Sequence, residues 1–273
     1  MTLLRPDLPI YGNVGTLREF DPLLYPKTND IDCIVSYPIF LEENGKRRMD
    51  DGTKGLNNHI KELENLKKKV EWITNVPVSK NDIKVEFIIS ICGYVIDDYC
   101  IDYLSSIDDE YLNKNVHCVV FQRPNIGWQW GSLEDIWIKY KDTNCKYFVS
   151  SEVDLEFLNE PYWYDECKEL IKGDKICFIS DIQKNPIDPH NYYGPLNSRT
   201  WKDKNNKTIE GYVDTTHTNG SYFIRSDFLD EMYKTYGCFT YALTANFELD
   251  AIVYGEIGFC QRAIELGYKW RIR

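Results

Sequence analysis

A strand–helix–strand pattern between residues 116 and 150 limits what this chain can fold into. Val116 to Phe121 is an apolar run of strand length, and Cys145 to Ser150 is a second one. Between them, large apolar side chains recur at three- and four-residue steps, which predicts a helix from about Trp128 to Tyr140. A strand, a helix and a strand within about 35 residues have the size of a crossover that joins parallel strands. We therefore predict an α/β fold with a mixed, mostly parallel central sheet flanked by helices.

Further strands and helices are predicted on both sides of this unit. The expected strands are residues 32–37, 84–91, 176–180, 221–225 and 268–272. The expected helices are one with apolar residues from Leu56 to Ile73, one from Pro161 to about Gly173, a short one from Asp227, and a last one that ends at Leu266 before Gly267. Residues 42–55 and 181–211 are expected to be loops, and residues 1–30 an N-terminal arm. No linker-like composition interrupts residues 31–273, so we predict a single domain.

The composition argues against several classes of protein. The chain has 273 residues and a formal net charge of -11, and such an acidic balance disfavours nucleic acid as a partner. No apolar run reaches the length of a membrane span, and the first thirty residues lack a signal-peptide core. The nine cysteines include no Cys-x-x-Cys pair. We interpret them as reduced core thiols of a cytoplasmic protein.

Two carboxylates follow the strand that ends at Ser150. In the run Tyr147-Phe148-Val149-Ser150-Ser151-Glu152-Val153-Asp154, Glu152 and Asp154 are two residues apart, so an extended backbone directs both to one side. Carboxylate oxygens on a rigid strand end are suitable ligands for a divalent metal ion that holds a diphosphate. The carboxyl end of a parallel strand is also where open α/β sheets bind ligands. The alternative is that both residues only solvate a turn.

Two polar segments are further candidates for ligand contacts. Residues 123–131 connect a predicted strand to its helix; their glycines allow the backbone to approach a ligand, and Arg123 can pair with phosphate oxygens. His217 precedes a predicted strand and is a candidate for metal or substrate contact. The alternatives are an ordinary strand-to-helix turn for the first segment and a hydrogen-bonded structural histidine for the second.

Glu256 is a candidate general base. It falls at the expected start of the last helix, in the run Tyr254-Gly255-Glu256-Ile257-Gly258. A carboxylate in that position can accept the proton of a sugar hydroxyl. The alternative is that Glu256 only interacts favourably with the helix dipole.

Taken in order, these segments resemble the GT-A-fold glycosyltransferases, in particular the inverting, family-2-like members. The carboxylate pair resembles the acidic D-x-D-type metal motif of that family, and the turn Asn125-x-Gly127 resembles the one that precedes this motif. The tail Arg262-Ala263-x-x-x-Gly267-Tyr268 resembles the segment that follows the family's catalytic carboxylate. The resemblance spans roughly residues 32–273, and the Asn-, Lys- and Ile-rich composition is similar to that of cytosolic members encoded by large algal viruses.

The resemblance implies a Rossmann-like GT-A domain, with a nucleotide-binding part at about residues 31–155 and an acceptor and catalytic part at about residues 156–273. It implies that a sugar moves from a UDP- or GDP-linked donor to a hydroxyl of a glycan or glycoprotein acceptor, with inversion and with Mn²⁺ or Mg²⁺. The implied metal ligands are Asp154, Glu152 and His217. The implied nucleotide contacts are Ser36, Tyr37, Pro38, Arg123, Asn125, Glu152 and Val153. The implied catalytic base is Glu256.

Two departures from the family pattern leave alternatives open. Glu152 stands where the family has an aspartate, which makes Asp154 the stronger metal ligand. Ile257 follows Glu256 where many relatives carry a second acid, so Asp250 and Glu248 remain alternative bases. A nucleotide-sugar-forming nucleotidyltransferase is a second functional hypothesis, although residues 36–41 lack the glycine- and lysine-rich phosphate loop expected of one. A carbohydrate-binding protein without enzyme activity is the third.

Overall fold

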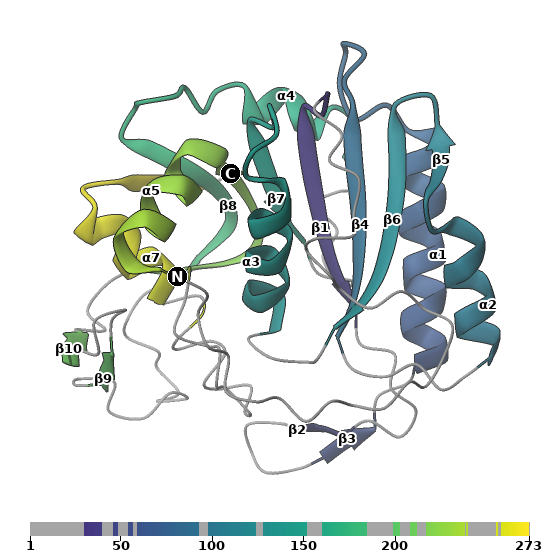
Figure 1. Ribbon diagram of the computed structural model, residues 1–273, viewed down its shortest axis with the longest axis horizontal. Helices are drawn as coiled ribbons and strands as arrows, with labels where there is room; N and C mark the ends of the chain where they lie inside the picture. The colour runs from purple at the N-terminus through teal and green to yellow at the C-terminus, as the bar shows by residue number, and fades with distance from the viewer. Residues whose placement is uncertain are drawn as a thin grey trace.

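An eight-stranded mixed sheet forms the centre of the computed structural model (Figure 1). The structure describes residues 30–39, 46–48, 54–56, 59–92, 98–123, 128–151, 160–184, 199–202, 208–211, 217–237, 239, 255 and 258–272. The strands of the sheet are β1 (Cys33–Ile39), β4 (Val85–Cys92), β5 (Glu110–Asn113), β6 (Val116–Arg123), β7 (Tyr147–Ser150), β8 (Ile176–Lys184), β11 (His217–Arg225) and β12 (Lys269–Ile272). Their order in the sheet is β12-β8-β11-β7-β1-β4-β6-β5.

The predicted mostly parallel α/β fold is confirmed. Strand β1 pairs in parallel with β4 on one side and with β7 on the other, and β4 pairs in parallel with β6. β11 is antiparallel to β7 and β8, and β5 is antiparallel to β6. The two strands of the predicted crossover therefore run in the same direction, but they are not neighbours, because β7 pairs with β1 and not with β6.

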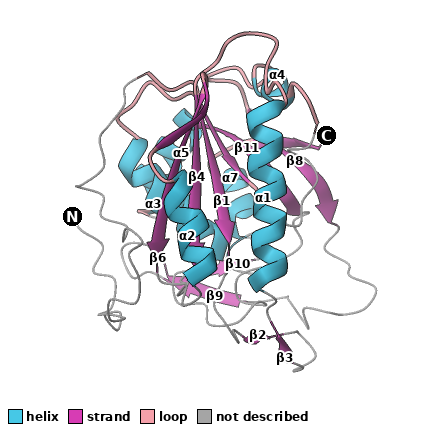
Figure 2. Ribbon diagram, turned by 90° about the vertical axis from the view of Figure 1, so that its right-hand side faces the viewer, coloured by secondary structure: helices cyan, strands magenta, loops and turns pink. Residues whose placement is uncertain are grey.

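Helices cover both faces of the sheet. They are α1 (His59–Asn75), α2 (Asp98–Ile107), α3 (Trp128–Tyr140), α4 (Trp163–Cys167), α5 (Ser226–Tyr236) and α7 (Gly258–Glu265). Buried side chains of α1, α2 and α4 form one core with the sheet, and those of α3, α5 and α7 form the other (Figures 1 and 2). β1 contributes to both cores: Val35 and Tyr37 belong to the first and Ile34 to the second, as the period of two in a strand requires.

Several predicted boundaries agree closely with the structure. α3 begins at Trp128 and ends at Tyr140, as expected from its apolar period. The last helix ends in a Schellman motif: Gly267 has φ 81°, its N–H donates to Ile264 O at 2.8 Å, and Tyr268 N–H donates to Ala263 O at 2.8 Å. Glycine suits this position because an L-residue with a side chain is strained at positive φ.

The structure corrects the prediction in five places. Residues 42–55 contain part of a short hairpin, formed by β2 (Lys46–Arg48) and β3 (Lys54–Leu56), and residues 181–211 contain the end of β8 and a second hairpin, formed by β9 (Arg199–Lys202) and β10 (Thr208–Gly211). The prediction also lacked α2 and β5, and the helix expected after Pro161 is only α4. Residues 1–29 of the predicted arm lie outside the described residues.

The cysteines and the absence of a membrane-spanning helix were also predicted from the sequence. Eight of the nine cysteines lie in the described part of the chain, and all eight are buried free thiols. Burial raises the pKa of the Cys118 thiol, as expected for a core residue that stays protonated. Among the described residues, no helix is long and apolar enough to cross a bilayer.

A buried polar network holds together the amino ends of β4 and β6. His117 Nδ1 lies 3.0 Å from a carboxylate oxygen of Glu86, and its Nε2 lies 3.3 Å from Asp109 Oδ1. The hydroxyl of Tyr140, at the end of α3, donates to Glu86 at 2.8 Å. The hydrogen bond with Glu86 raises the pKa of His117, against the opposing effect of burial. The ring of Tyr111 covers the imidazole, with centroids 4.8 Å apart.

This network predicts a pH dependence of stability. The folded-state pKa of His117 lies above its unfolded value, so the interaction stabilises the fold fully below the unfolded pKa of about 6.5 and is lost as the pH rises through the folded pKa. Between about pH 6 and pH 9, the free energy of unfolding should fall more steeply for the wild type than for His117→Gln. Urea denaturation at constant ionic strength measures both slopes; equal slopes would contradict the assignment.

Candidate functional site

The strand order reverses at β1, and this reversal locates the candidate site. The chain passes from β1 outward through β4 to β6 and then returns to the other side of β1 as β7. In open α/β sheets, ligands bind outside the carboxyl ends of the strands at such a point. Both small hairpins, β2–β3 and β9–β10, lie on the same side of the molecule as these strand ends (Figures 1 and 2).

The predicted metal-binding segment begins directly at this point. Glu152, Val153 and Asp154 lie outside the described residues, but the residue before them is fixed by three strands. Ser151 N–H donates to Ser36 O of β1 at 3.0 Å, and Ser151 Oγ lies 3.0 Å from Ser221 Oγ of β11. Ser151, the residue that precedes the two carboxylates in the sequence, is therefore fully buried and held at this end of the sheet.

Small polar side chains line the sheet beneath this exit, on the face covered by α3. Ser36 of β1 and Ser150 of β7 are register partners, and Ser36 Oγ lies 3.3 Å from Ser132 Oγ of α3. Ser90 of β4 also contacts Ser132 through its hydroxyl. All four serines are fully buried. A layer of hydroxyl groups thus crosses three parallel strands near the end of the sheet where open α/β folds bind ligands.

Three polar atoms in this region have no partner among the described residues. They are Ser150 Oγ, Gln129 Oε1 and Trp130 Nε1, and their side chains are buried, with exposures of 0%, 6% and 1%. Gln129 lies in the first turn of α3, three residues before Ser132. A buried polar group without a hydrogen bond costs about 1–3 kcal/mol, so such groups commonly mark a place where a ligand or water belongs. The amino terminus of a 13-residue helix in the same place favours an anion.

Gly255, the residue before Glu256 in the sequence, lies at the same end of the sheet. Gly255 packs directly on the indole of Trp130 in the first turn of α3; a Cβ on Gly255 would lie 2.4 Å from Cδ1 of that ring. The Trp130 ring in turn contacts Tyr222 of β11 at 4.8 Å, and Tyr222 is the register partner of Ser150. Glu256 follows Gly255 in sequence and lies outside the described residues, as do the alternative bases Glu248 and Asp250.

The predicted nucleotide contacts on β1 have different environments. Ser36 belongs to the hydroxyl layer, and Pro38 is half-buried near the end of the strand. Tyr37 points to the opposite face, into the core with α1, where its ring lies 5.6 Å from that of Phe87. Asn125, in the turn before α3, lies outside the described residues.

Arg123, the predicted phosphate partner, lies at the end of β6 in a buried ion pair. Its Nε donates to Asp135 Oδ2 at 2.9 Å, both side chains are 1% exposed, and one terminal nitrogen lies 3.6 Å from Cys92 Sγ. Burial lowers the pKa of Arg123, but the neighbouring Asp135 outweighs this effect and the pKa is raised overall. In this arrangement Arg123 ties the end of β6 to α3, an intramolecular role that the sequence did not reveal.

His217, the third predicted metal ligand, begins β11. It pairs with Lys184 at the end of β8, and its side chain is outside what the structure describes. Because β11 is antiparallel to β7, the first residues of β11 lie at the end of the sheet where β7 ends. Among the side chains that are described, no group of three His, Cys, Asp or Glu residues could hold a metal ion. The three predicted ligands are not among those side chains.

Comparisons with known proteins identify no family. No protein-family model and no curated protein sequence matches the chain. A CMP-2-keto-3-deoxy-manno-octonic acid synthetase solved in complex with CTP is similar to it at 9% identity and a TM-score of 0.41, over 89% of each chain. A protein assigned as a UDP-N-acetylglucosamine pyrophosphorylase from Entamoeba histolytica is similar at 11% identity and a TM-score of 0.30, over 74% of this chain and 60% of that one.

The Gly255–Trp130 contact makes a prediction about stability. Gly255→Ala should destabilise the protein by about 1–3 kcal/mol, the usual cost of overpacking, because the Trp130 ring is stacked on Phe259 at 4.5 Å and cannot move freely. Denaturant unfolding measures the loss. In a Trp130→Leu background, where the shorter side chain can rotate away, the same substitution should cost clearly less. An equal cost in both backgrounds would rule out the contact.

Proposed function

We propose that this protein is a nucleotide-sugar enzyme that binds a nucleoside diphosphate and a divalent metal ion at the carboxyl ends of β1 and β7. The proposal rests on contacts that bring two acidic segments to one place. Gly255, the residue before Glu256, packs on Trp130, and Trp130 contacts Tyr222. Tyr222 is the register partner of Ser150, which lies two residues before Glu152. Two acidic segments about 100 residues apart in sequence therefore start from the same end of the sheet, where α/β enzymes bind nucleotides.

The chemistry of the donor set fits a hard divalent cation. Asp154 and Glu152, with His217, would hold Mn²⁺ or Mg²⁺, since carboxylate oxygens are the ligands such ions prefer. When bound, the ion would neutralise charge on the diphosphate leaving group. The unsatisfied Ser150 hydroxyl and Gln129 carbonyl would meet polar groups of the substrate, and the amino terminus of α3 would favour its phosphates.

Glycosyl transfer is the reaction we propose for this site. Glu256 would accept the proton of an acceptor hydroxyl, and the hydroxyl oxygen would form a bond to the anomeric carbon of the donor sugar. The bond from that carbon to the diphosphate oxygen would break on the opposite side, so the configuration would invert and the nucleoside diphosphate would leave. A glycan or glycoprotein would be the acceptor, and Asp250 or Glu248 would be the base if Glu256 is not.

Nucleotidyl transfer is the second candidate. A nucleotide bound at the same strand ends would serve this reaction equally, and both solved structures described above carry names of that class. In this case a sugar phosphate would attack the α-phosphorus of a nucleoside triphosphate and release pyrophosphate. We place it second because residues 36–41 contain neither glycine nor lysine, although a phosphate loop after the first strand would be expected to contain both.

Metal-dependent binding tests the nucleotide site. Asp154→Asn should weaken Mn²⁺-dependent binding of UDP or GDP by about tenfold or more, because it removes a charged metal ligand. Thermal stability without ligand should stay unchanged. Calorimetric titration with and without Mn²⁺ measures the effect, and Asp102→Asn, which removes the same charge from an exposed position of α2, is the matched control. Equal loss in both variants, or none in either, would refute the metal site.

Turnover assays test the reaction. Glu256→Gln should keep the affinity for the donor and lower turnover by about 10²–10⁴-fold, the usual contribution of a general base. Release of nucleoside diphosphate from UDP- or GDP-sugars, with inversion seen by NMR of the product, is the expected activity. Release of pyrophosphate from a nucleoside triphosphate and a sugar phosphate would instead establish nucleotidyl transfer. Full activity in the Glu256→Gln variant would move the base to another residue.

A further inference from the structure

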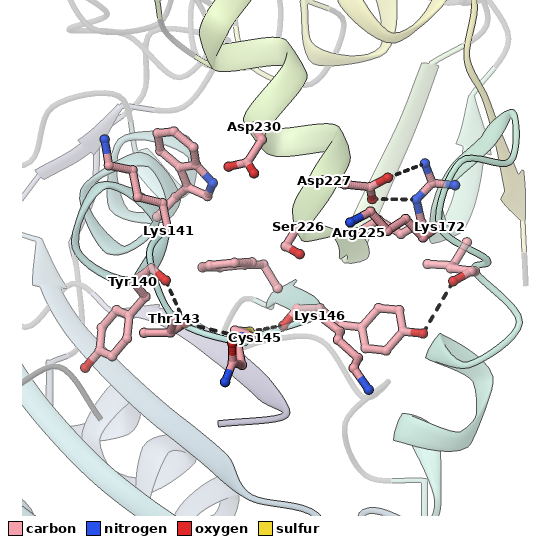
Figure 3. A pocket seen from close by; sticks show the side chains of 15 residues that line it. Tyr140, Lys141, Thr143, Cys145, Lys146, Lys172, Arg225, Ser226, Asp227 and Asp230 are labelled. Atoms are coloured by element: carbon pink, nitrogen blue, oxygen red, sulfur yellow. Dashed lines mark hydrogen bonds and ion pairs between the residues drawn. The ribbon is translucent and has the colours of Figure 1, made fainter. Parts of the chain in front are cut away.

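A second concave site lies at the opposite end of the sheet from the candidate nucleotide site. It is a pocket of about 410 Å³ at the amino end of β7, between the end of α3, the start of α5 and the segment before β8 (Figure 3). Tyr147 and Phe148 of β7 line it, whereas Ser150 and Ser151 belong to the other end of the strand. A volume of this size is in the range of pockets that bind small molecules, which is about 300–1,000 Å³.

The lining of this pocket is basic in an otherwise acidic protein. Three lysines surround it: Lys141 follows α3, Lys146 precedes β7, and Lys172 follows α4 (Figure 3). All three are exposed, and within the described residues none of them forms an ion pair with a carboxylate. The chain as a whole carries a net charge of -11, so three lysines that line one pocket make the surface charge locally positive in a negatively charged protein.

One wall of the pocket is held rigidly by Arg225. This guanidinium is 2% exposed; its Nε and one terminal nitrogen donate to both oxygens of Asp227, at 2.8 and 3.0 Å. The other terminal nitrogen donates to the carbonyls of Ile171, Asp174 and Ile176, at 2.6, 2.8 and 2.9 Å. Arg225 therefore fixes the segment that carries Lys172 beside the start of α5, and it neutralises one of the two carboxylates in the pocket.

The second carboxylate, Asp230, does not balance the three lysines. Burial raises its pKa, and the neighbouring Lys234 and Lys141 act in the opposite direction. Ser226 presents a hydroxyl at the first turn of α5, an 11-residue helix whose amino terminus lies at the pocket (Figure 3). The partial positive charge of that terminus adds to the charge of the lysines.

We propose that this pocket binds a small phosphorylated anion, with Lys141, Lys146 and Lys172 as its ion partners and the Ser226 hydroxyl at the start of α5 as a hydrogen-bond donor. The N–H of Ser226 itself donates to Lys146 O at 2.9 Å. Phosphate oxygens suit this lining because ammonium groups on flexible side chains bind them without a fixed planar geometry. The aromatic rings of Trp137 and Tyr147 at the pocket would contact an apolar part of the same molecule. The site is separate from the one proposed for the nucleotide, and it does not depend on that proposal.

Titration with inorganic pyrophosphate in the absence of divalent metal tests this site. The double variant Lys146→Gln/Lys172→Gln should bind the probe about tenfold more weakly than the wild type, as expected for the loss of two partly exposed ion pairs. Lys68→Gln, an exposed lysine on α1, is the matched control and should bind like the wild type. Asp154→Asn should also bind like the wild type, because that residue belongs to the other end of the sheet.

Two results would overturn the proposal. One is wild-type affinity in the double variant. The other is absence of pyrophosphate binding to the wild type at low ionic strength, where attraction between exposed charges is strongest. Binding lost in Asp154→Asn but kept in the double variant would assign the anion to the nucleotide site instead. Circular dichroism and thermal melts of each variant separate a lost contact from a lost fold.

Discussion

The parallel pairing of β1 with β4 on one side and β7 on the other is the constraint on which the rest of this structure depends. A strand in this position is hydrogen-bonded along both edges and packed on both faces, and every β1 residue except Pro38 is buried. The chain can reach both neighbours in parallel only through crossovers on the faces of the sheet. The same pairing reverses the strand order at β1, and the carboxyl ends of the strands beside such a reversal are where open α/β sheets bind ligands.

Helix α3 packs on this part of the sheet and contributes side chains to both proposed sites. Its first turn contributes Gln129 and Trp130 to the candidate nucleotide site, and its last turn contributes Trp137 and Tyr140 to the basic pocket. Its polar residues are buried as well: Asp135 pairs with Arg123, and Glu134 accepts the N–H of Phe239 at 3.0 Å. Removing one partner of a buried ion pair costs several kcal/mol, so such contacts fix the helix in one position on the sheet.

Local patterns predicted the elements whose side chains repeat with a clear period. In α3, Trp130, Leu133, Trp137 and Tyr140 recur at three- and four-residue steps, and Gly267 marks the end of the last helix by backbone geometry alone. α2 was missed because only Cys100 and Leu104 are buried on it, which is too short a signal for a helix. The hairpins were missed because three- and four-residue strands in polar sequence have no visible alternation.

For the candidate nucleotide site, the sequence indicated which segments take part but not which residues contact one another. The end of β7 was recognisable because an apolar run stops at two carboxylates, but contacts between distant residues are set by tertiary packing. Nothing local indicates that Arg123 meets Asp135 or that Gly255, 125 residues after Trp130, packs on its ring. The same holds for the basic pocket, whose lysines come from two separate segments, residues 141–146 and the segment after α4, and appear in the sequence as ordinary surface charge.

The most direct test of the central claim is the position of manganese in a crystal of the protein grown with UDP or GDP and Mn²⁺. Anomalous diffraction at the manganese edge locates the ion independently of the interpretation of the surrounding density. We expect one strong peak beside the carboxyl ends of β1 and β7, within bonding distance of Asp154 and next to the diphosphate. A peak elsewhere, or nucleotide bound at another surface with Asp154 turned away from it, would contradict the proposed metal site.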